Sequence, residues 1–225
     1  MCGRMVINLS PETITEIYGI IQKIDRERNP RYNVAPTQDI PIVRQNPDGA
    51  RSLTSVHWGL IPSWAKDLSI GNRMINARAE TLAEKPAFRA AFKHRRCLVP
   101  ASGYYEWQQL PDGRKQPYYI HPGNDAPLTL AGLWEQWHSP EGTVIESCTV
   151  ITTSANKAIA SIHERMPVIL PQSAFNLWLD DHTQRDKLTE LLVTPSNELL
   201  TLVPVSTMVN SPRHTGPECI KPVDV

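Results

Sequence analysis

Between Cys97 and Ile151 the chain alternates short apolar runs with turn signals, and this alternation constrains the fold more than any other feature. Five segments have the composition of strands: Cys97–Val99, Tyr104–Trp107, Tyr118–His121, Leu128–Leu133 and Val144–Ile151. The triplets at 111–113 and 122–124 each combine proline and glycine with a polar residue, as turns do. Twenty prolines are spread over the 225 residues, which excludes long uninterrupted helices. The pattern predicts many short strands joined by rigid loops.

Helices are predicted on either side of this β region. Ser10 is a favourable N-cap and Pro11 a favourable first helical residue, and the helix that they begin is expected to fade near Asp25. Its apolar face recurs at helical spacing, at Ile14, Ile17, Tyr18 and Ile21. Further helices are expected from Pro86 onward, at Ser173–Leu179, and at Gln184–Val193 with Thr183 as its cap.

The remaining segments complete the predicted fold. Ile40–Val43, Leu53–Leu60 and Leu200–Val205 are expected to be extended, and Asn29 to Pro36 is expected to be a loop bounded by prolines. We find no internal repeat and no linker-like stretch. We therefore expect an α+β fold in a single domain over residues 1–225, with a barrel-like core of short strands surrounded by helices.

Composition narrows the class of protein. Lys and Arg together number 23, equal to Asp and Glu at 23, so any nucleic-acid site has to be a local basic surface on a balanced molecule. The four cysteines are far apart and include no Cys-x-x-Cys pair, so neither a zinc site nor a disulfide set is expected. The chain contains no apolar run of membrane-spanning length and no segment like a signal peptide. We expect a cytoplasmic monomer that contacts no membrane and needs no metal or organic cofactor.

The second residue offers the most distinctive chemistry. Once Met1 is removed, which a residue as small as Cys2 should permit, the chain begins with an α-amine and a thiol on adjacent carbons. An α-amine has a pKa of about 7.7–8.0 against about 10.4 for lysine, so much more of it is neutral and nucleophilic near pH 7. It can condense with an aldehyde to an imine, on which the thiol closes as a five-membered thiazolidine. Many proteins carry a small second residue by chance, so position alone does not establish this role.

Glu106 is a candidate acid–base residue. It lies between Tyr105 and Trp107 in a predicted strand. Burial among aromatic rings would raise the pKa of its carboxyl and make it a proton donor or acceptor near neutrality. The alternative is that the aromatic residues face inward and Glu106 faces solvent, and the sequence does not choose between the two.

Two further motifs contain polar residues that packing alone does not require. Asn76 and Arg78 stand two positions apart, so an extended backbone directs both to the same side. His163 precedes Arg165 by two residues and is a candidate proton shuttle, although a histidine satisfied in the core or exposed in a loop also fits.

Contacts to a nucleic acid have several candidates. The planar guanidinium groups of Arg4, Arg78 and Arg165 match phosphate oxygens, although a single arginine more often forms a surface salt bridge. Trp64 is a candidate for stacking on a base, whereas Trp58 is expected in the core.

Five motifs follow one another along the chain. They are Cys-Gly-Arg at 2–4, Arg-Tyr-Asn-x-Ala-Pro at 31–36, Ile-Asn-Ala-Arg-x-Glu-Thr at 75–81, aromatic-Glu-Trp at 105–107 and Ile-His-x-Arg-Met-Pro at 162–167. Together they resemble the SRAP family (SOS-response-associated peptidase), the abasic-site-processing proteins, and the resemblance extends from Cys2 to the tail around Cys219. The chain departs from the family at Met5, which is usually aromatic, and at Trp64-Ala65, where some relatives have two tryptophans.

The resemblance implies a β-rich protein that senses abasic sites in single-stranded DNA, forms a covalent crosslink to them through its N-terminal cysteine and shields the lesion from strand cleavage. It implies catalytic roles for Cys2, Asn76, Glu106 and His163. The expected DNA contacts are Trp64 and five residues of the same motifs: Arg4, Asn33, Pro36, Arg78 and Arg165. A minor lyase activity and peptidase action on Met1 are expected beside the crosslink.

Other classes of protein remain open at this stage. N-terminal-nucleophile glutamine amidotransferases also begin Met-Cys-Gly, but they carry an Asn-Gly motif that this chain lacks. A thiol peptidase would pair Cys2 with His163. A non-covalent single-strand binder would be strongly salt-dependent and indifferent to the lesion. Replication-fork proteins as partners leave no signature in the sequence.

Overall fold

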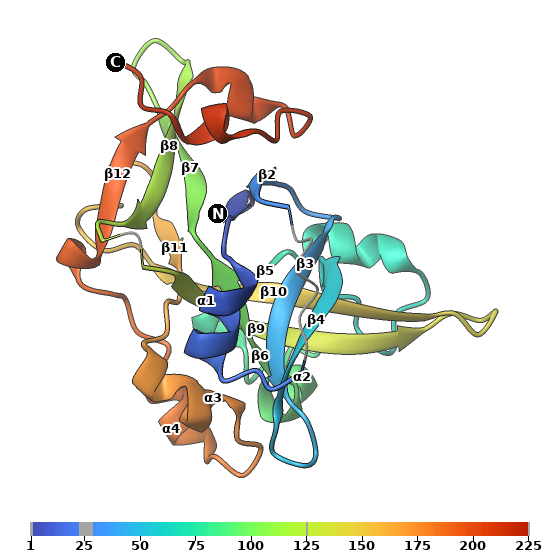
Figure 1. Cartoon of the computed structure of the whole chain (residues 1–225). Coiled ribbons are helices and arrows are strands. Elements are labelled where there is room, and N and C mark those ends of the chain that lie inside the picture. Colours follow the sequence, from blue (N-terminus) through green and yellow to red (C-terminus); the bar gives the residue numbers. More distant parts are fainter. Residues whose placement is uncertain (1, 23–28, 125, 225) are drawn as a thin grey trace.

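A closed β-barrel forms the core of the α+β fold, as predicted (Figure 1). The computed structural model describes residues 2–22, 29–124 and 126–224. The barrel strands pair in the order β10-β4-β3-β6-β9, and β9 pairs again with β10, which closes the ring. The pairs are antiparallel except β4 with β10. Their bounds are β3 (Asp39–Gln45), β4 (Arg51–Trp58), β6 (Arg96–Ala101), β9 (Leu128–His138) and β10 (Val144–Ser154).

Alternate residues of each barrel strand join one buried interior cluster, as the two-residue period of a strand requires. Cys2 and Tyr104 belong to the same cluster, so the N-terminal segment packs against the barrel interior. Trp58 is fully buried there, as expected. The barrel contributes Ile40, Ile42, Val56, Trp58, Cys97, Val99, Ala101, Leu128, Leu130, Cys148 and Val150.

A second, antiparallel sheet packs against the barrel (Figure 1). Its order is β12-β8-β7-β1-β2, and its strands are β12 (Leu200–Pro204), β8 (Lys115–Pro122), β7 (Gly103–Gln109), β1 (Met5–Ile7) and β2 (Arg31–Val34). Met5 and Tyr104 face the barrel cluster, while Val6 and Tyr105 face the C-terminal segment. Met5 is fully buried, so the apolar packing expected of an aromatic residue is kept.

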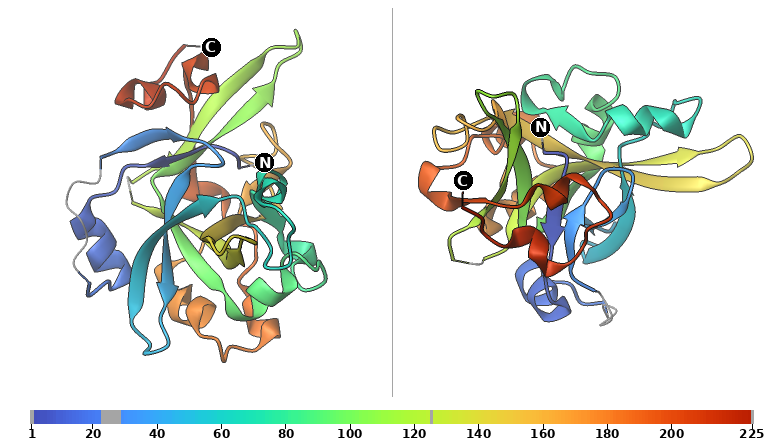
Figure 2. Two further views of the ribbon diagram at one scale, coloured as in Figure 1. Left: turned by 90° about the vertical axis from the view of Figure 1, so that its right-hand side faces the viewer. Right: turned by 90° about the horizontal axis from the view of Figure 1, so that it is seen from above.

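Four α-helices pack on the other face of the barrel strands: α1 (Pro11–Tyr18), α2 (Arg89–His94), α3 (Phe175–Leu179) and α4 (Arg185–Glu190). They contact the outward-facing residues Val43, Leu98, Leu133 and Ile151. These helices gather at the end of the barrel away from the C-terminal segment (Figure 2, left). No helix among the described residues is long and apolar enough to cross a bilayer.

The first helix is shorter than predicted. Ser10 caps it as expected, since its hydroxyl accepts a hydrogen bond from the Thr13 amide at 3.0 Å. The helix ends at Tyr18 because Gly19 adopts the left-handed conformation, with φ of 63°. Asp25, where the helix was expected to fade, lies outside the described residues.

Two other helix predictions also need correction. Helix α2 begins at Arg89 and not at Pro86. Helix α4 has Gln184 as its N-cap, and the Thr183 hydroxyl instead donates to the Leu177 carbonyl at 2.8 Å.

Short strands were missed or predicted as loop. Strand β2 replaces the expected loop from Asn29 to Pro36, and β1 and β11 (Arg165–Pro167) were not foreseen. Strand β5 (Asn76–Arg78) has the extended backbone expected there. Each has only three or four residues, too few for a local apolar pattern to reveal it. Short 3-10 helices complete the chain: Leu68–Arg73, Ala79–Thr81, Gln172–Ala174, Asn197–Leu199, Thr207–Asn210 and Pro217–Ile220.

Gly59 and Gly71 approach each other closely at the base of the loop that carries Trp64. Gly59 has φ of 141°, and a Cβ placed on it would lie 2.6 Å from the carbonyl oxygen of Gly71. We predict that Gly59→Ala lowers the free energy of unfolding by about 2 kcal/mol or more, because the obstructing atom is backbone. Urea denaturation measures this change. Gly123→Ala, whose Cβ would meet only the Thr201 hydroxyl at 3.1 Å, is the control, and equal effects from both would contradict the prediction.

Candidate functional site

Cys2 is held in place by Asn76. The side-chain amide of Asn76 donates to the backbone carbonyl of Cys2 at 2.9 Å. Strand β5 pairs with β10, where Asn76 lies opposite Val150, so the barrel wall fixes the position of this amide. Cys2 is fully buried, which means that the N-terminal residue is oriented by the core rather than by solvent contacts.

Glu106 faces the same side of β7 as Tyr104 and is only 2% exposed. The neighbouring Tyr105 packs on the opposite face, so the strand alternation buries the carboxylate on the barrel side. Burial raises the pKa of Glu106, and the nearby charge of His163 partly opposes this rise. Of the two orientations that the sequence left open, the structure has the buried one.

His163 lies with Glu106 in the wall of a cavity of about 400 Å³, which we call the His163 cavity. Its Nδ1 accepts a hydrogen bond from the Arg165 backbone amide at 3.0 Å. In the neutral ring the proton is therefore carried by Nε2, which makes that nitrogen the donor for an incoming group. The cavity is also lined by Trp107, Lys115 and Asn210.

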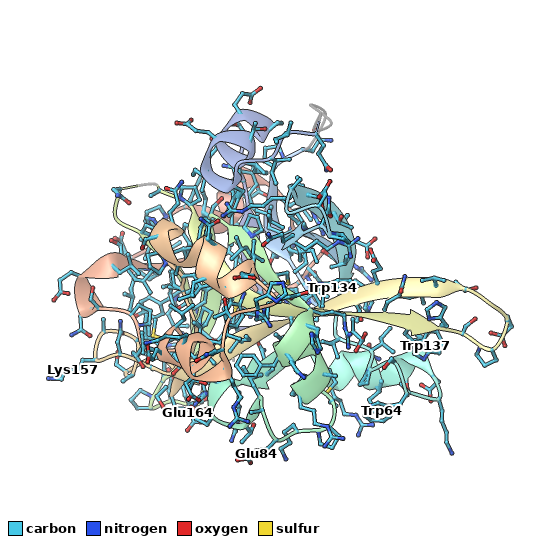
Figure 3. The ribbon with its side chains drawn as sticks, turned by 90° about the horizontal axis from the view of Figure 1, so that it is seen from below. Trp64, Glu84, Trp134, Trp137, Lys157 and Glu164 are labelled. Atoms are coloured by element: carbon cyan, nitrogen blue, oxygen red, sulfur yellow. The ribbon has the colours of Figure 1, made fainter. Side chains whose placement is uncertain are left out.

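A second cavity, the Trp64 groove, has a volume of about 430 Å³ and combines an exposed aromatic ring with cations. Trp64 is 59% exposed. The carbonyl of the adjacent Ala65 accepts a hydrogen bond from the indole of Trp137 at 2.8 Å, so the β9–β10 hairpin supports this loop (Figure 3). The groove is lined by Trp64, Arg73, Met74, Asn76, Arg78, Thr81, Lys85, Pro86, Ala87 and Phe88. Positive charge beside an exposed indole suits the phosphates and bases of a single strand.

Cys2 lines neither cavity but interacts with one residue of each. Asn76, which lines the Trp64 groove, is hydrogen bonded to it, and Glu106 of the His163 cavity is close enough for its charge to affect the thiol. Burial, and then the charge of Glu106, raise the pKa of the Cys2 thiol far above its ordinary value. The sulfur is therefore a neutral thiol at physiological pH, and the reactive thiolate is disfavoured.

Arg4 and Asn33 form an internal anchor for the C-terminal segment. Arg4 donates to the Asn33 side-chain oxygen at 2.8 Å and to the Val209 carbonyl at 2.6 Å. The Asn33 amide donates to the carbonyls of Val209, Ser211 and His214 at 2.8–3.2 Å. Asn33 is 1% exposed, so in this arrangement it holds the protein together and presents no surface to DNA. Pro36 lies apart from this cluster, in the turn between β2 and β3, and is half-buried.

Arg165 is engaged in a partly buried ion pair. Its two terminal nitrogens contact the Glu80 carboxylate at 2.6 and 2.9 Å, and one of them also donates to the Thr152 carbonyl at 2.7 Å. A phosphate contact from Arg165 stays a prediction, and it requires release of this pair. Arg78, by contrast, is exposed in the Trp64 groove.

Sequence reasoning missed several residues that line the two cavities. Arg73 lies three residues before Asn76, and its nearness to that motif is the one signal that pointed to it. Lys85, Lys115 and Asn210 carry no signal in the sequence, because only the fold brings them to the site. A cavity of about 500 Å³ lies by the β3–β4 turn, β9 and the end of α3, and one of about 760 Å³ lies beside α2 and α4, but none of the predicted site residues lines them.

The chain is similar to known proteins over most of its length. The family model for SOS response associated peptidase (SRAP) matches residues 1–212. The abasic site processing protein YoqW of Bacillus subtilis (strain 168) is 42% identical over 223 residues, covering 98% of this chain and 99% of that protein. The abasic site processing protein HMCES of Mus musculus is 30% identical over 272 residues, covering 100% of this chain and 77% of that protein.

A solved structure shares the fold. A protein from Bacteroides thetaiotaomicron superposes with a TM-score of 0.88 at 26% identity, covering 99% of this chain and 100% of that chain. This chain belongs to the SRAP family.

The Arg165–Glu80 pair makes stability depend on pH. Hydrogen bonding from Arg165 lowers the pKa of Glu80 below 4.5, its ordinary value, so the stabilisation is complete above that pH and is lost as pH falls through the lowered pKa. We predict that Glu80→Gln lowers the free energy of unfolding at pH 7 by about 1 kcal/mol, since Glu80 is half exposed and screened. The difference from wild type should shrink below about pH 4.5, as measured by urea denaturation. Exposed Glu84→Gln is the control, and a pH-independent difference for Glu80→Gln would contradict the prediction.

Proposed function

We propose that this protein senses abasic sites in single-stranded DNA and captures them as a thiazolidine through Cys2. One observation carries the proposal: Asn76, which lines a basic, aromatic groove, donates a hydrogen bond to Cys2, and the charge of Glu106, which lines a cavity with His163, reaches the Cys2 thiol. Two relatives that match nearly the whole chain are named abasic site processing proteins, which supports the same substrate.

The Trp64 groove provides the binding step. Arg73, Arg78 and Lys85 attract the phosphates on either side of the lesion, and the exposed Trp64 ring offers a stacking surface to a neighbouring base. A single strand suits this site because the abasic sugar has to turn out of any stack to reach a buried residue.

The chemistry then follows in four steps. His163 protonates the ring oxygen as the deoxyribose opens to an aldehyde. The α-amine of Cys2 attacks C1′, and Glu106 moves the protons that allow water to leave, which gives the imine. The thiol adds across the C=N bond, so a C–S bond forms and the thiol proton passes to nitrogen. The balance is the loss of one water, and closure is fast because sulfur and imine belong to one residue.

Burial of Cys2 favours the amine as the first nucleophile. Its thiol is held neutral by the core and by Glu106, whereas an α-amine is partly neutral near pH 7. A thiol hydrolase, whether peptidase or glutamine amidotransferase, attacks with sulfur and gains from an available thiolate. The geometry therefore supports the crosslink over hydrolysis. We propose a minor lyase activity from imines that do not close, and peptidase action limited to Met1.

The thiazolidine also explains a benefit to the DNA. A free aldehyde acidifies its neighbouring hydrogens and promotes elimination of the 3′ phosphate. Closure of the ring removes the carbonyl, so the strand is shielded from cleavage.

We predict that protein lacking Met1 gives a heat-stable shifted band with an oligonucleotide that contains one abasic site. Cys2→Ala should abolish the band, because it removes the sulfur that traps the imine. Glu106→Gln should slow band formation by about 100-fold or more, since 100-fold is the lower end of the usual contribution of acid–base catalysis, with little effect on DNA binding. Denaturing gels and intact-mass analysis measure both. Glutamine or peptide turnover without a band would favour the hydrolase, and equal losses of binding and rate would remove Glu106 from the acid–base role.

The groove also generates a prediction about affinity. Trp64→Ala should weaken binding to single-stranded DNA by about 5- to 100-fold, the range expected for loss of one stacked base. Arg73→Gln should lower the salt dependence of binding by about 0.7 in the slope of log K against log salt. Fluorescence anisotropy at several salt concentrations measures both. Val193→Ala and Arg114→Gln, which change exposed residues outside the groove, are the controls and should bind as wild type does.

A further inference from the structure

Tyr104 carries a buried hydroxyl that packing does not explain. The residue is fully buried, and its hydroxyl has no hydrogen-bond partner among the described residues. Other buried tyrosines are satisfied: the hydroxyl of Tyr18 pairs with Thr129 at 2.8 Å, and that of Tyr105 donates to the Tyr32 carbonyl at 2.7 Å. An unpaired buried hydroxyl is destabilising, and phenylalanine would fill the same space without that cost.

The location of Tyr104 relates this hydroxyl to the reactive residue. Tyr104 and Glu106 are two positions apart on β7 and share its barrel face, and Tyr104 belongs to the same buried cluster as Cys2. Burial, then the charges of Cys2 and Glu106, raise the pKa of Tyr104 well above its ordinary value. The phenol therefore remains protonated, which leaves an O–H donor in the same buried cluster as the thiol.

Ring closure is the step that needs such a donor. As the C–S bond forms, the thiol releases its proton and the sulfur carries negative charge for part of the step. The same burial that keeps the thiol neutral makes this charge costly. A fixed O–H dipole that is unpaired beforehand offsets the cost without first breaking another bond.

We propose that Tyr104 is a further catalytic residue, whose hydroxyl donates a hydrogen bond to the Cys2 sulfur as the thiazolidine closes. The inference rests on the proposed function and deepens it. The Tyr104 proton stays on its oxygen throughout: the thiol proton passes to the imine nitrogen with the help of Glu106, and no further reactant is needed.

Tyr104→Phe tests the inference because it removes only the hydroxyl. Stability in urea should be unchanged or higher, and affinity for an oligonucleotide with a tetrahydrofuran analogue, which has no aldehyde, should be unchanged. Formation of the thiazolidine on a true abasic site should slow by about 10- to 100-fold, the range for a hydrogen bond to a charged group. The imine should accumulate, because its formation does not involve sulfur, and borohydride trapping followed by intact-mass analysis detects it.

Tyr18→Phe is the matched control. It removes a paired hydroxyl on the helix side of the barrel, so it should lower stability while leaving ring closure as in wild type. If Tyr104→Phe closes the ring at the wild-type rate, or slows imine formation and closure equally, the inference is wrong. If wild type itself forms no crosslink, the proposed function fails instead, so the two failures are distinguishable.

Discussion

Pairing by strand β10 is the constraint on which the site depends. This strand closes the barrel with β9 and β4, and near its C-terminal end it also pairs with β5 and β11. Strand β5 carries Asn76, which holds Cys2, and β11 begins at Arg165, whose amide fixes the ring of His163. One strand thus sets the distances between residues that lie up to 160 positions apart in the sequence, and a change in its register would move all of them together.

The second constraint is the burial of the reactive groups. Cys2, Tyr104 and Glu106 are nearly or completely inaccessible, and burial raises the pKa of each. Such surroundings favour neutral forms, so a carboxylic acid, a phenol and a thiol can lie together without repulsion. Protons can then move between them at neutral pH, which is the property that a condensation reaction requires.

The sequence predicted the barrel better than the second sheet. The barrel segments Cys97–Val99 and Leu128–Leu133 lie within β6 and β9, because their alternation of apolar residues is strong and local. Strands β1 and β2 are too short for a local pattern. The motifs predicted Asn76, Glu106 and His163 as site residues, and the fold places them around Cys2. They also suggested Asn33 as a DNA contact, although its amide is occupied by backbone carbonyls near the C-terminus. A motif indicates that a residue is required, but only the structure distinguishes a residue that supports the fold from one that can contact DNA.

The anchor formed by Arg4 and Asn33 has a consequence for the order of events during synthesis. Its carbonyl partners lie at Val209, Ser211 and His214, and Val209 follows Asn33 by 176 residues and Arg4 by 205. The ribosome makes the chain from its N-terminal side, so Arg4 and Asn33 are synthesised long before the carbonyls that hold them. The anchor can form only after residues 209–214 have emerged. The segment that carries Cys2 is thus made early and fixed late.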